Sequence, residues 1–334
     1  MWQLTNQTPY AVDRAWTRDK NGAYIWVVAV KATYDIRVNG ELALAHEPTP
    51  PLLAPEFWGD EATSSLRWDA DLVPPKTSTD VILEGSAYAP RGAATSRVFV
   101  SLRMGDVSKS LVVHGPRVYD VTVRGQVVAG GAEAFREHPI RYEDAFGGAD
   151  LTDPDPRRQV YDTQNPVGKG RAFDPRRLRG TPAHRVEYAD GTERPAGFGP
   201  IASFWSPRRE RAGTYGVAWD RDRKPLLPDD YDELHLQSAP DDQRPSQPLR
   251  GGEPVVIENM TPDGFLRFNL PRIYPTFTTW FGSRSQEHRA RMGTVLVQPG
   301  ERKVVLVFQT SLRVPHRELD YLDRTVVGEK TYIS

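Results

Sequence analysis

The residues of this chain that could perform acid–base or metal chemistry are its seven His and its 44 Asp and Glu. A metal site is often visible as two closely spaced His, because His-x-His or His-Glu-x-x-His places both imidazoles on one face of a strand or helix. The His here are scattered singly, at positions 46, 114, 138, 184, 235, 288 and 316. His138 lies near Glu143 and Asp144, but ionisable residues are common in a turn-rich stretch. The sequence therefore predicts no metal and no cofactor.

Nucleophilic catalysis has no recognisable motif either. The chain contains no Cys, which excludes thiol catalysis, disulfides and thiolate metal sites. It has no Gly-x-Ser-x-Gly turn, and Ser64-Ser65 lies in a segment without a nearby His. Paired carboxylates could still hydrolyse a glycoside, but this requires a separation in space that sequence spacing does not reveal. We predict that the protein is not an enzyme, with a hydrolase acting on polysaccharide or peptide as the alternative.

Two short segments have some features of ligand-binding loops. Asn165-Pro-Val-Gly-Lys-Gly-Arg171 contains glycines and cations, but it lacks the Walker spacing and its Pro removes one backbone donor. Asp153-Pro-Asp155-Pro places two carboxylates on one side of an extended segment, whereas calcium needs several further oxygen ligands. We interpret both segments as turns, with Lys169 and Arg171 in solvent or paired with neighbouring acids.

The charge balance argues against several classes of partner. With 43 Lys and Arg against 44 Asp and Glu, the formal net charge is −1. Proteins that bind nucleic acid or membrane surfaces usually carry an excess of positive charge. No stretch approaches the about 20 apolar residues of a membrane span, and the first six residues lack the order of charges in a secretory signal. We expect no nucleic acid, no membrane and a cytoplasmic location.

The elements that would position any site are mainly strands. Residues 23–37 are rich in Val, Ile, Tyr and Trp and follow Asn21-Gly22, a dipeptide typical of hairpin turns. Similar segments, separated by Gly or Pro, occur at 42–45, 80–89, 97–104, 109–113, 118–122, 254–258, 265–270, 294–298 and 303–310. This rhythm predicts a mainly β fold, an antiparallel β-sandwich or barrel-like scaffold with few short helices. A helical turn is expected at 318–323.

Residues 138–252 have a different composition. Pro recurs through this region, yet Tyr, Phe and Trp are also spread through it, whereas disordered segments are poor in aromatics. We predict a long, ordered loop region with one short helix beginning at Pro207, capped by Ser206. Loops of this length in a compact domain are usually functional. We interpret the chain as one module, 1–334, with an N-terminal β region (1–137), the loop-rich central region (138–252) and a C-terminal β region (253–334) that completes the scaffold.

Motifs along nearly the whole chain resemble one bacterial family. The most specific are Arg141-Tyr142-Glu-Asp-Ala-Phe146-Gly147-Gly148 and Asn165-Pro-Val-Gly168-Lys-Gly170. Others are Val27-Val-Ala-Val-Lys31-Ala-Thr33-Tyr34-Asp35, Ser64-Ser-Leu-Arg67-Trp68, Gly197-Phe198-Gly199-Pro200-Ile201 with Trp205, Pro225-Leu-Leu-Pro228-Asp-Asp-Tyr231, Leu249-Arg-Gly251-Gly-Glu253 and Phe268-Asn-Leu-Pro271. Together they are similar to domain-of-unknown-function family 2169, whose members lie beside type VI secretion genes.

The resemblance implies a cytosolic adaptor or chaperone. Such a protein would bind the N-terminal region of a type VI effector and help load it onto the VgrG spike or its PAAR tip. The family motifs carry no catalytic residue to this chain. A further alternative is a structural component of the secreted spike complex.

Arg and aromatic residues are enriched at the positions that dominate the energetics of protein interfaces. The candidate partner-binding residues are therefore rings of the central region: Tyr142, Phe146, Phe198, Trp205 and Tyr231. Each ring could instead pack in the core beneath its loop. The Arg pairs of this region could likewise brace the loops against Asp-rich turns.

Overall fold

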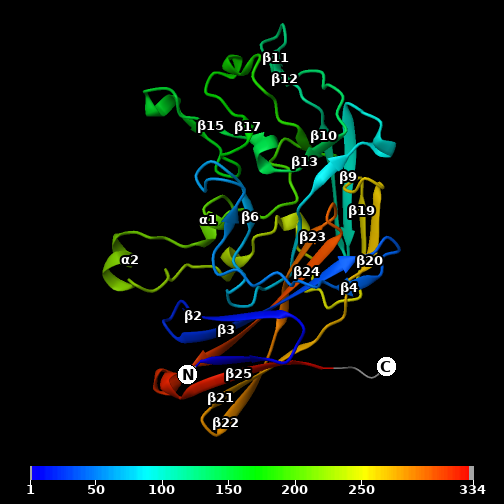
Figure 1. The fold of residues 1–334 in the computed structure, drawn as a ribbon. Coiled ribbons are helices and arrows are strands. Elements are labelled where there is room, and N and C mark those ends of the chain that lie inside the picture. Colours follow the sequence, from blue (N-terminus) through cyan, green and yellow to red (C-terminus); the bar gives the residue numbers. More distant parts are fainter. Residues whose placement is uncertain (1, 331–334) are drawn as a thin grey trace.

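The structure, a computed structural model, describes residues 2–330. Within this range the fold is mainly β with few short helices, as the sequence predicts (Figure 1). Three larger sheets form the scaffold, and the remaining strands pair two by two. No sheet among these residues closes into a barrel. Of the two predicted architectures, the one built from open, mainly antiparallel sheets is observed, and the barrel-like one is wrong.

The central sheet combines strands from both ends of the chain. Its order is β2-β3-β24-β23-β7, with β4 also paired to β3. The strands are β2 (Ala11–Arg18), β3 (Tyr24–Ile36), β4 (Leu42–Leu44), β7 (Asp80–Leu83), β23 (Arg291–Gln298) and β24 (Lys303–Val314). Pairing is antiparallel except between β7 and β23. The hairpin turn predicted at Asn21-Gly22 joins β2 to β3, and β23 and β24 form a second hairpin. β3 pairs with β24 over residues 24–35.

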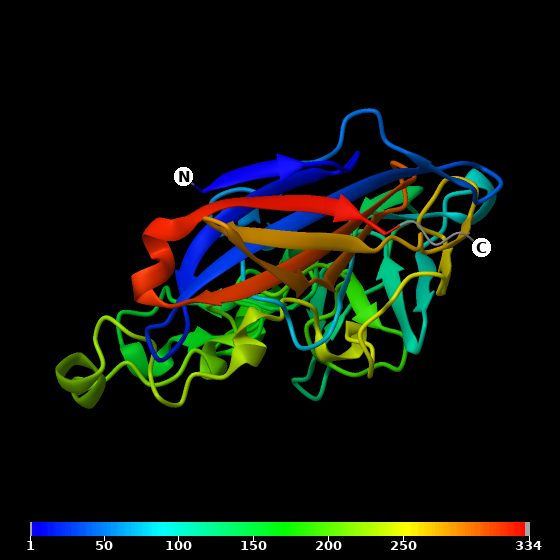
Figure 2. The same cartoon turned by 90° about the horizontal axis from the view of Figure 1, so that it is seen from below.

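Both faces of the central sheet are covered. Val28, Val30 and Ala32 of β3 point into the main core, while the alternate residues Lys31 and Thr33 are buried on the opposite face. A strand buried on both faces reads as a continuous apolar run, which explains the composition of this segment. In Figure 2 the central region, drawn in green, lies to one side of the strands from the two chain ends.

A second sheet combines strands from all three regions of the chain. Its order is β18-β10-β9-β19-β20, and every pair is antiparallel. The strands are β9 (Arg97–Met104), β10 (Val107–His114), β18 (Val186–Tyr188), β19 (Pro254–Glu258) and β20 (Phe265–Asn269). Buried and exposed residues alternate along β9 and β20, so one face packs on the core. β9, β10, β19 and β20 coincide closely with predicted segments, whereas β18 lies in the central region, where no strand was predicted.

The terminal sheet has the order β1-β25-β21-β22. Its strands are β1 (Gln3–Asn6), β21 (Pro275–Phe281), β22 (Arg284–Arg289) and β25 (Leu322–Glu329). A buried hydrogen bond of 2.8 Å from Trp26 Nε1 to Thr325 Oγ1 links this sheet to the central one. The predicted helical turn is observed as η7 (His316–Tyr321), a 3-10 helix that starts and ends two residues earlier than expected because β25 begins at Leu322.

The short elements connect the sheets and build the central region. In the first part of the chain they are β5 (Glu56–Phe57), β6 (Leu66–Trp68), β8 (Ser86–Tyr88), η1 (Pro90–Gly92), β11 (Tyr119–Val121) and β12 (Val127–Ala129). The central region contains β13 (Glu137–Pro139), η2 (Tyr142–Asp144), β14 (Phe146–Gly147), β15 (Ala149–Asp150), η3 (Pro156–Arg158), β16 (Val160–Tyr161), β17 (Lys169–Gly170), η4 (Pro175–Leu178), α1 (Arg208–Arg211), α2 (Val217–Asp222), η5 (Glu233–Leu236) and η6 (Asp241–Gln243). The predicted strand 80–89 is two strands, because β7 pairs with β23 whereas β8 pairs with β13.

The helix predicted after Ser206 is present as α1, but its cap differs. Pro207 occupies the N-cap position, and no side chain caps the helix. The Ser206 hydroxyl instead donates to the Glu210 carboxylate one turn later. The prediction that Ser206 caps the helix is therefore wrong, since its hydroxyl is already used by Glu210.

Candidate functional site

The two most specific sequence motifs pack against each other. β14 pairs in parallel with β17, and the completely buried Asn165 donates from Nδ2 to the carbonyl oxygens of Tyr142 (2.8 Å) and Phe146 (3.0 Å). Gly147 adopts φ +144°, and a Cβ there would lie 2.3 Å from the carbonyl oxygen of Asn165. Glycine is required both by this backbone conformation and by the close approach. The motifs therefore form one folding unit.

Charged side chains join the two motifs to each other and to the residues beside them. Lys169 Nζ lies 2.5 Å from Asp144 Oδ1, and His138 Nε2 lies 2.9 Å from Asp144 Oδ2. Burial disfavours ionisation of Asp144, but hydrogen bonds from His138 and Lys169 lower its pKa to about 2. Arg171 pairs with Asp162 at 2.9 Å. Lys169 and Arg171 thus pair with neighbouring acids, as the turn interpretation of 165–171 allows.

A second polar cluster lies in an open pocket of about 430 Å³ beside the motifs. Glu187 binds His114 Nε2 at 3.1 Å and His184 Nε2 at 2.9 Å. Arg117 also pairs with Glu187, and the Tyr119 hydroxyl lies 2.5 Å from His184 Nδ1. Burial disfavours charge on Glu187, yet these partners hold its pKa well below the usual range. Burial raises the pKa of Tyr119.

This arrangement is poorly suited to acid–base catalysis. A carboxyl group whose pKa is held far below neutrality does not carry a proton to give, and a Tyr with a raised pKa is a weaker nucleophile near pH 7. Both oxygens of Glu187 and both ring nitrogens of His184 are occupied by protein partners. The cluster therefore braces β10, β11 and β18.

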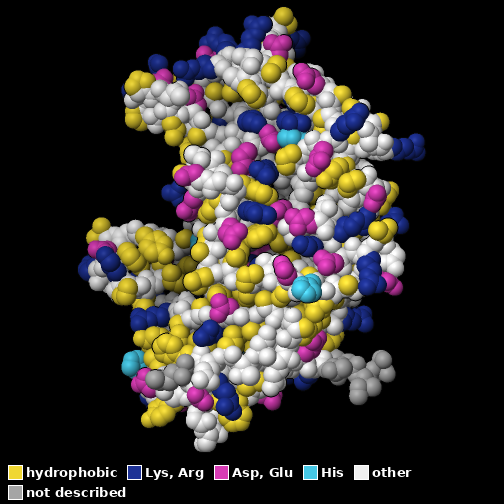
Figure 3. Space-filling model, viewed as in Figure 1, with side chains coloured by type: hydrophobic (Ala, Val, Ile, Leu, Met, Phe, Trp, Pro, Cys, Tyr) yellow, Lys and Arg dark blue, Asp and Glu magenta, His cyan; other side chains and the backbone are white. Residues whose placement is uncertain are grey.

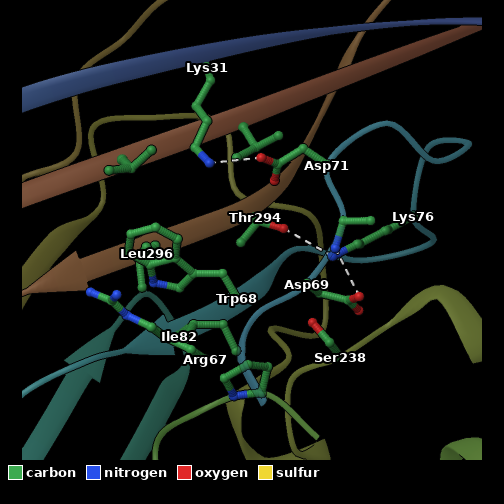
Figure 4. Close-up of a pocket in the computed structure, with 14 residues that line it drawn as sticks. Lys31, Arg67, Trp68, Asp69, Asp71, Lys76, Ile82, Ser238, Thr294 and Leu296 are labelled. Atoms are coloured by element: carbon green, nitrogen blue, oxygen red, sulfur yellow. Dashed lines mark hydrogen bonds and ion pairs between the residues drawn. The ribbon is translucent and has the colours of Figure 1, made fainter. Parts of the chain in front are cut away.

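A small cavity lies where the central region crosses the central sheet (Figure 4). Lys31 Nζ binds Asp71 Oδ2 at 2.7 Å, and Lys76 Nζ binds Asp80 Oδ2 at 2.6 Å and Thr294 Oγ1 at 3.0 Å. The cavity has a volume of about 30 Å³, enough for a water molecule but not for a substrate. Lys31 and Lys76 therefore hold the segment 71–76 against the central sheet, and the central region is joined to Asp80 through Gln237 and Ser238.

The five predicted partner-binding rings differ in exposure. Tyr142, Phe198 and Trp205 are only 5%, 1% and 1% exposed, and Tyr142 meets Trp205 edge to face at 6.0 Å. None of these three rings presents a surface to a partner in this structure; each packs beneath its loop, which is the second role that the sequence allowed. Phe146 and Tyr231 are half-buried.

The two half-buried rings do not form one site. Phe146 has the Arg171 guanidinium 4.7 Å from its ring centre and lies in the pocket of the Glu187 cluster. Tyr231 packs against His235 at 5.7 Å, and burial together with Glu233 raises the pKa of Tyr231 to about 12. A binding role for these two rings remains a prediction.

A cleft of about 540 Å³ lies at the base of a projecting lobe, residues 213–230, which carries α2. It is lined by Thr163, Gln164, Ser206, Pro207, Glu210, Arg211, Asp230 and Asp232. Figures 1 and 3 show the lobe, here named the α2 lobe, standing out from the body of the molecule. The cleft thus lies between the α2 lobe, α1 and the segment that precedes the second motif.

Buried residues hold the wall of the cleft in place. Arg208 is almost fully buried and donates to the carbonyl oxygens of Ile201 (2.6 Å) and His235 (2.9 Å). Its guanidinium also pairs with Asp69 at 2.9 Å. The amide of Ser206 donates to the carbonyl oxygen of Thr163 at 2.8 Å, which joins the two walls. The contacts of Arg208 and Ser206 therefore hold α1 in place, although this helix is only a single turn long.

The α2 lobe exposes apolar side chains although it is internally hydrogen-bonded. Thr214 binds both carboxylate oxygens of Asp230, which closes the base of the lobe, and Trp219 Nε1 donates to the carbonyl oxygen of Leu226 at 2.7 Å. Tyr215 lies against Trp219, with ring centres 4.8 Å apart. Tyr215 is nevertheless 53% exposed and Val217 is 88% exposed. The hydrophobic side chains on the lobe are visible in Figure 3.

Sequence reasoning missed the α2 lobe as a candidate surface. Its aromatics Tyr215 and Trp219 had no feature that separated them from the other rings of the central region. The available signal was a short segment, 217–224, that begins with Val-Ala-Trp and is bracketed by Gly213 and Gly216 on one side and by Pro225 on the other. Such residues favour a chain reversal, and a reversal of this length cannot bury its own apolar residues.

The described residues contain neither a cluster suited to a metal ion nor a helix suited to a membrane. No group of three or more His, Cys, Asp or Glu side chains within residues 2–330 is arranged to hold a metal ion. Within the same range, no helix has both the length and the apolar character needed to cross a membrane.

The fold and the cleft define a mainly β protein in which a long, loop-rich segment crosses the central sheet and projects a lobe. The sequence profile of a family described as "Uncharacterized protein conserved in bacteria (DUF2169)" matches residues 21–309. The chain belongs to this family, as its motifs indicated. No curated protein and no solved structure matches the chain.

Proposed function

We propose that this protein is a non-enzymatic, cytoplasmic adaptor or chaperone that binds a segment of another protein in the cleft beside the α2 lobe. Its partner is the N-terminal region of a type VI secretion effector, and the adaptor assists loading of that effector onto the VgrG spike or the PAAR tip. The observation that carries the proposal is the combination of an open cleft with an ordered lobe that exposes Tyr215 and Val217.

The chemistry of the cleft suits a polypeptide. Its volume, about 540 Å³, is also usual for small-molecule sites, so the ligand class is inferred from the groups that line it. Hydroxyl, amide and carboxylate groups of Thr163, Gln164 and Asp232 line it and can exchange hydrogen bonds with a main chain. Exposed apolar side chains rimmed by polar residues commonly mark protein interaction sites. The α2 lobe supplies such side chains next to the cleft.

The type VI assignment has a different support from the binding assignment. It rests on the family to which the chain belongs and on the genes beside which its members lie, whereas the cleft supports only the binding of a protein segment. The hydrolase alternative would have to use the His184–Glu187 pocket, where every catalytic candidate already has a protein partner. The geometry therefore favours binding of a protein segment over hydrolysis, and the adaptor role follows from the family.

The first test is co-purification with the candidate effector encoded beside the gene, using the Val217→Asp variant. We expect binding to fall at least about tenfold, because an apolar contact is lost and a carboxylate must be desolvated. The variant should fold normally, since Val217 is the first residue of α2 and an acidic residue is favourable there. Val123→Asp, a fully exposed Val in the turn between β11 and β12, is the matched control and should bind as the native protein does.

Other outcomes would decide against the proposal. Unchanged binding by Val217→Asp would remove the α2 lobe from the interface. A turnover on polysaccharide or peptide that Glu187→Gln abolishes would favour the hydrolase. Recovery of the protein from secreted material, in stoichiometric amounts with the spike, would make it a structural component of the spike.

A further inference from the structure

A separate pocket of about 170 Å³ opens beside the indole of Trp58. Four segments meet there: the end of β5, the connection from β7 to β8, the residues before η2 and the turn between β23 and β24. It is lined by Trp58, Glu84, Gly85, Ser86, Tyr88, Pro139, Ile140, Arg141, Gln298, Gly300 and Glu301. None of these residues lines the cleft beside the α2 lobe.

Arg141 is the unusual residue of this pocket. Its guanidinium lies 3.8 Å from the centre of the Trp58 ring. Among residues 2–330, no hydrogen bond or ion pair reaches this guanidinium, and its Nε atom is buried without a partner. The contrast is Arg67, which lies 4.7 Å from the same ring but pairs with Glu84 at 2.9 Å. Of the two guanidinium groups on the Trp58 ring, that of Arg67 is thus paired with a carboxylate and that of Arg141 is not.

An unneutralised, half-buried cation is costly unless an anion meets it. Burial of a charged group without a counter-ion removes its hydration, and stacking on an indole offsets only part of that cost. The stacked arrangement holds the guanidinium plane fixed, so its free N–H groups are preorganised for a planar, two-oxygen acceptor. The pocket therefore has the features of an anion site whose ligand comes from outside the chain.

We propose that the Trp58–Arg141 pocket binds the carboxylate of an acidic side chain carried by a peptide segment. Arg141 holds the carboxylate, and Trp58 with Ile140 contacts the hydrocarbon part of the side chain. This inference does not depend on the proposed adaptor function, because it concerns a ligand class at a different set of residues.

The rest of the pocket favours a carboxylate over a phosphate. Glu84 is already bound by Arg67 and by Trp68 Nε1 at 2.6 Å, and Glu301 lies 3.7 Å from Lys303. These two carboxylates repel a dianion more strongly than a monoanion. The volume of about 170 Å³ is below the about 300 Å³ at which sites for cofactors and drug-sized ligands begin. It accommodates one side chain.

The test is a titration with N-acetyl-glutamate amide, monitored by NMR of the tryptophan indole N–H groups, with the Trp58 resonance assigned through Trp58→Phe. We expect a saturable shift of that resonance and an affinity at least about tenfold higher than for the neutral, equally large N-acetyl-glutamine amide. Arg141→Gln should abolish the shift. Arg141→Lys keeps the charge but not the planar stack and should bind about tenfold more weakly.

Arg136→Gln, which removes an exposed Arg five residues earlier, is the matched control and should titrate as the native protein does. Equal affinity for the glutamate and glutamine probes, or an unchanged titration in Arg141→Gln, would overturn the proposal. So would inorganic phosphate that binds at Trp58 as tightly as the glutamate probe. If Arg141→Gln fails to fold, the two probes on the native protein and on Arg141→Lys still decide the question.

Discussion

The central sheet and the α2 lobe use apolar residues in opposite ways. In the sheet, Val28 and Val30 are completely buried, and a continuous ladder of backbone hydrogen bonds orders the strands around them. In the lobe, Val217 is almost fully exposed, although Thr214 and Trp219 hold the backbone in a defined shape. Ordering a backbone costs about 1–2 kcal/mol per residue, which apolar burial normally offsets. In the lobe this gain is smaller, since Trp219 and Leu226 are only half-buried, and an ordered backbone with exposed apolar residues is expected of a preformed binding surface.

Charged pairs show the same contrast. The Lys76–Asp80 pair, at the edge of the central sheet where Asp80 also binds Gln237 and Ser238, is almost completely buried. The Lys224–Asp220 pair of the α2 lobe is largely exposed on both sides. Solvent screening leaves little net energy in an exposed pair, whereas breaking a buried one strands a charge in a medium of low polarity. The two pairs should therefore respond very differently to the same substitution.

The largest predicted effect is that of Lys76→Met. It leaves the Asp80 carboxylate buried without its cation, with uncharged donors from Gln237, Ser238 and the Ala239 backbone. We expect the free energy of unfolding to fall by about 3–5 kcal/mol, measured by urea denaturation.

Lys224→Met is the matched control in the α2 lobe and should change the free energy of unfolding by less than about 0.5 kcal/mol. Equal losses in the two variants would contradict the view that the buried Lys76–Asp80 pair stabilises the fold more than the exposed Lys224–Asp220 pair does. The comparison requires equal m-values, because a change in m would indicate an altered denatured state.

The strands that could be predicted from the sequence are those whose apolar residues are close together in the chain. β3, β9 and β19 lie in Val- and Ile-rich segments bounded by turn residues, and their predicted bounds agree with the structure to within one residue. β22, whose sequence is Arg-Ser-Gln-Glu-His-Arg, and β25 were not predicted. β22 is polar throughout, and β25 is held between β21 and β1, which lies at the other end of the chain. Partners so distant in sequence leave no local signal.

The candidate site was harder to predict for a different reason. Aromatic residues suit both a core and an interface, so composition did not separate the buried Trp205 from an exposed ring such as Tyr215. The unpaired state of Arg141 is a property of its surroundings, since Arg67 on the same indole has a partner. Only the folded arrangement shows which of two chemically equal residues is left free.

The second prediction concerns the junction between the two family motifs. Asn165→Ala removes the amide that binds the carbonyl oxygens of Tyr142 and Phe146, which are buried or half-buried. We expect a loss of about 2 kcal/mol in the free energy of unfolding, since a buried acceptor loses its donor. Gln164→Ala, at the exposed neighbouring position, should be nearly neutral. A neutral Asn165→Ala would mean that backbone pairing of β14 with β17 is sufficient to hold the motifs together.

The smallest predicted effect is the pH dependence contributed by Asp144. Because its pKa in the folded protein is lowered to about 2 from 3.8, its stabilising contribution is fully present above the unfolded value and is lost as the pH falls from about 4 towards 2. Asp144→Asn should therefore be less stable than the native protein at pH 5, by about 1 kcal/mol after allowance for solvent screening, and the difference should vanish near pH 2. Urea denaturation of both proteins across this range measures the difference directly, and the low pKa of Glu187 affects both equally. A difference that persists unchanged at pH 2 would show that the carboxamide disturbs packing around His138 and Lys169 rather than removing a charge.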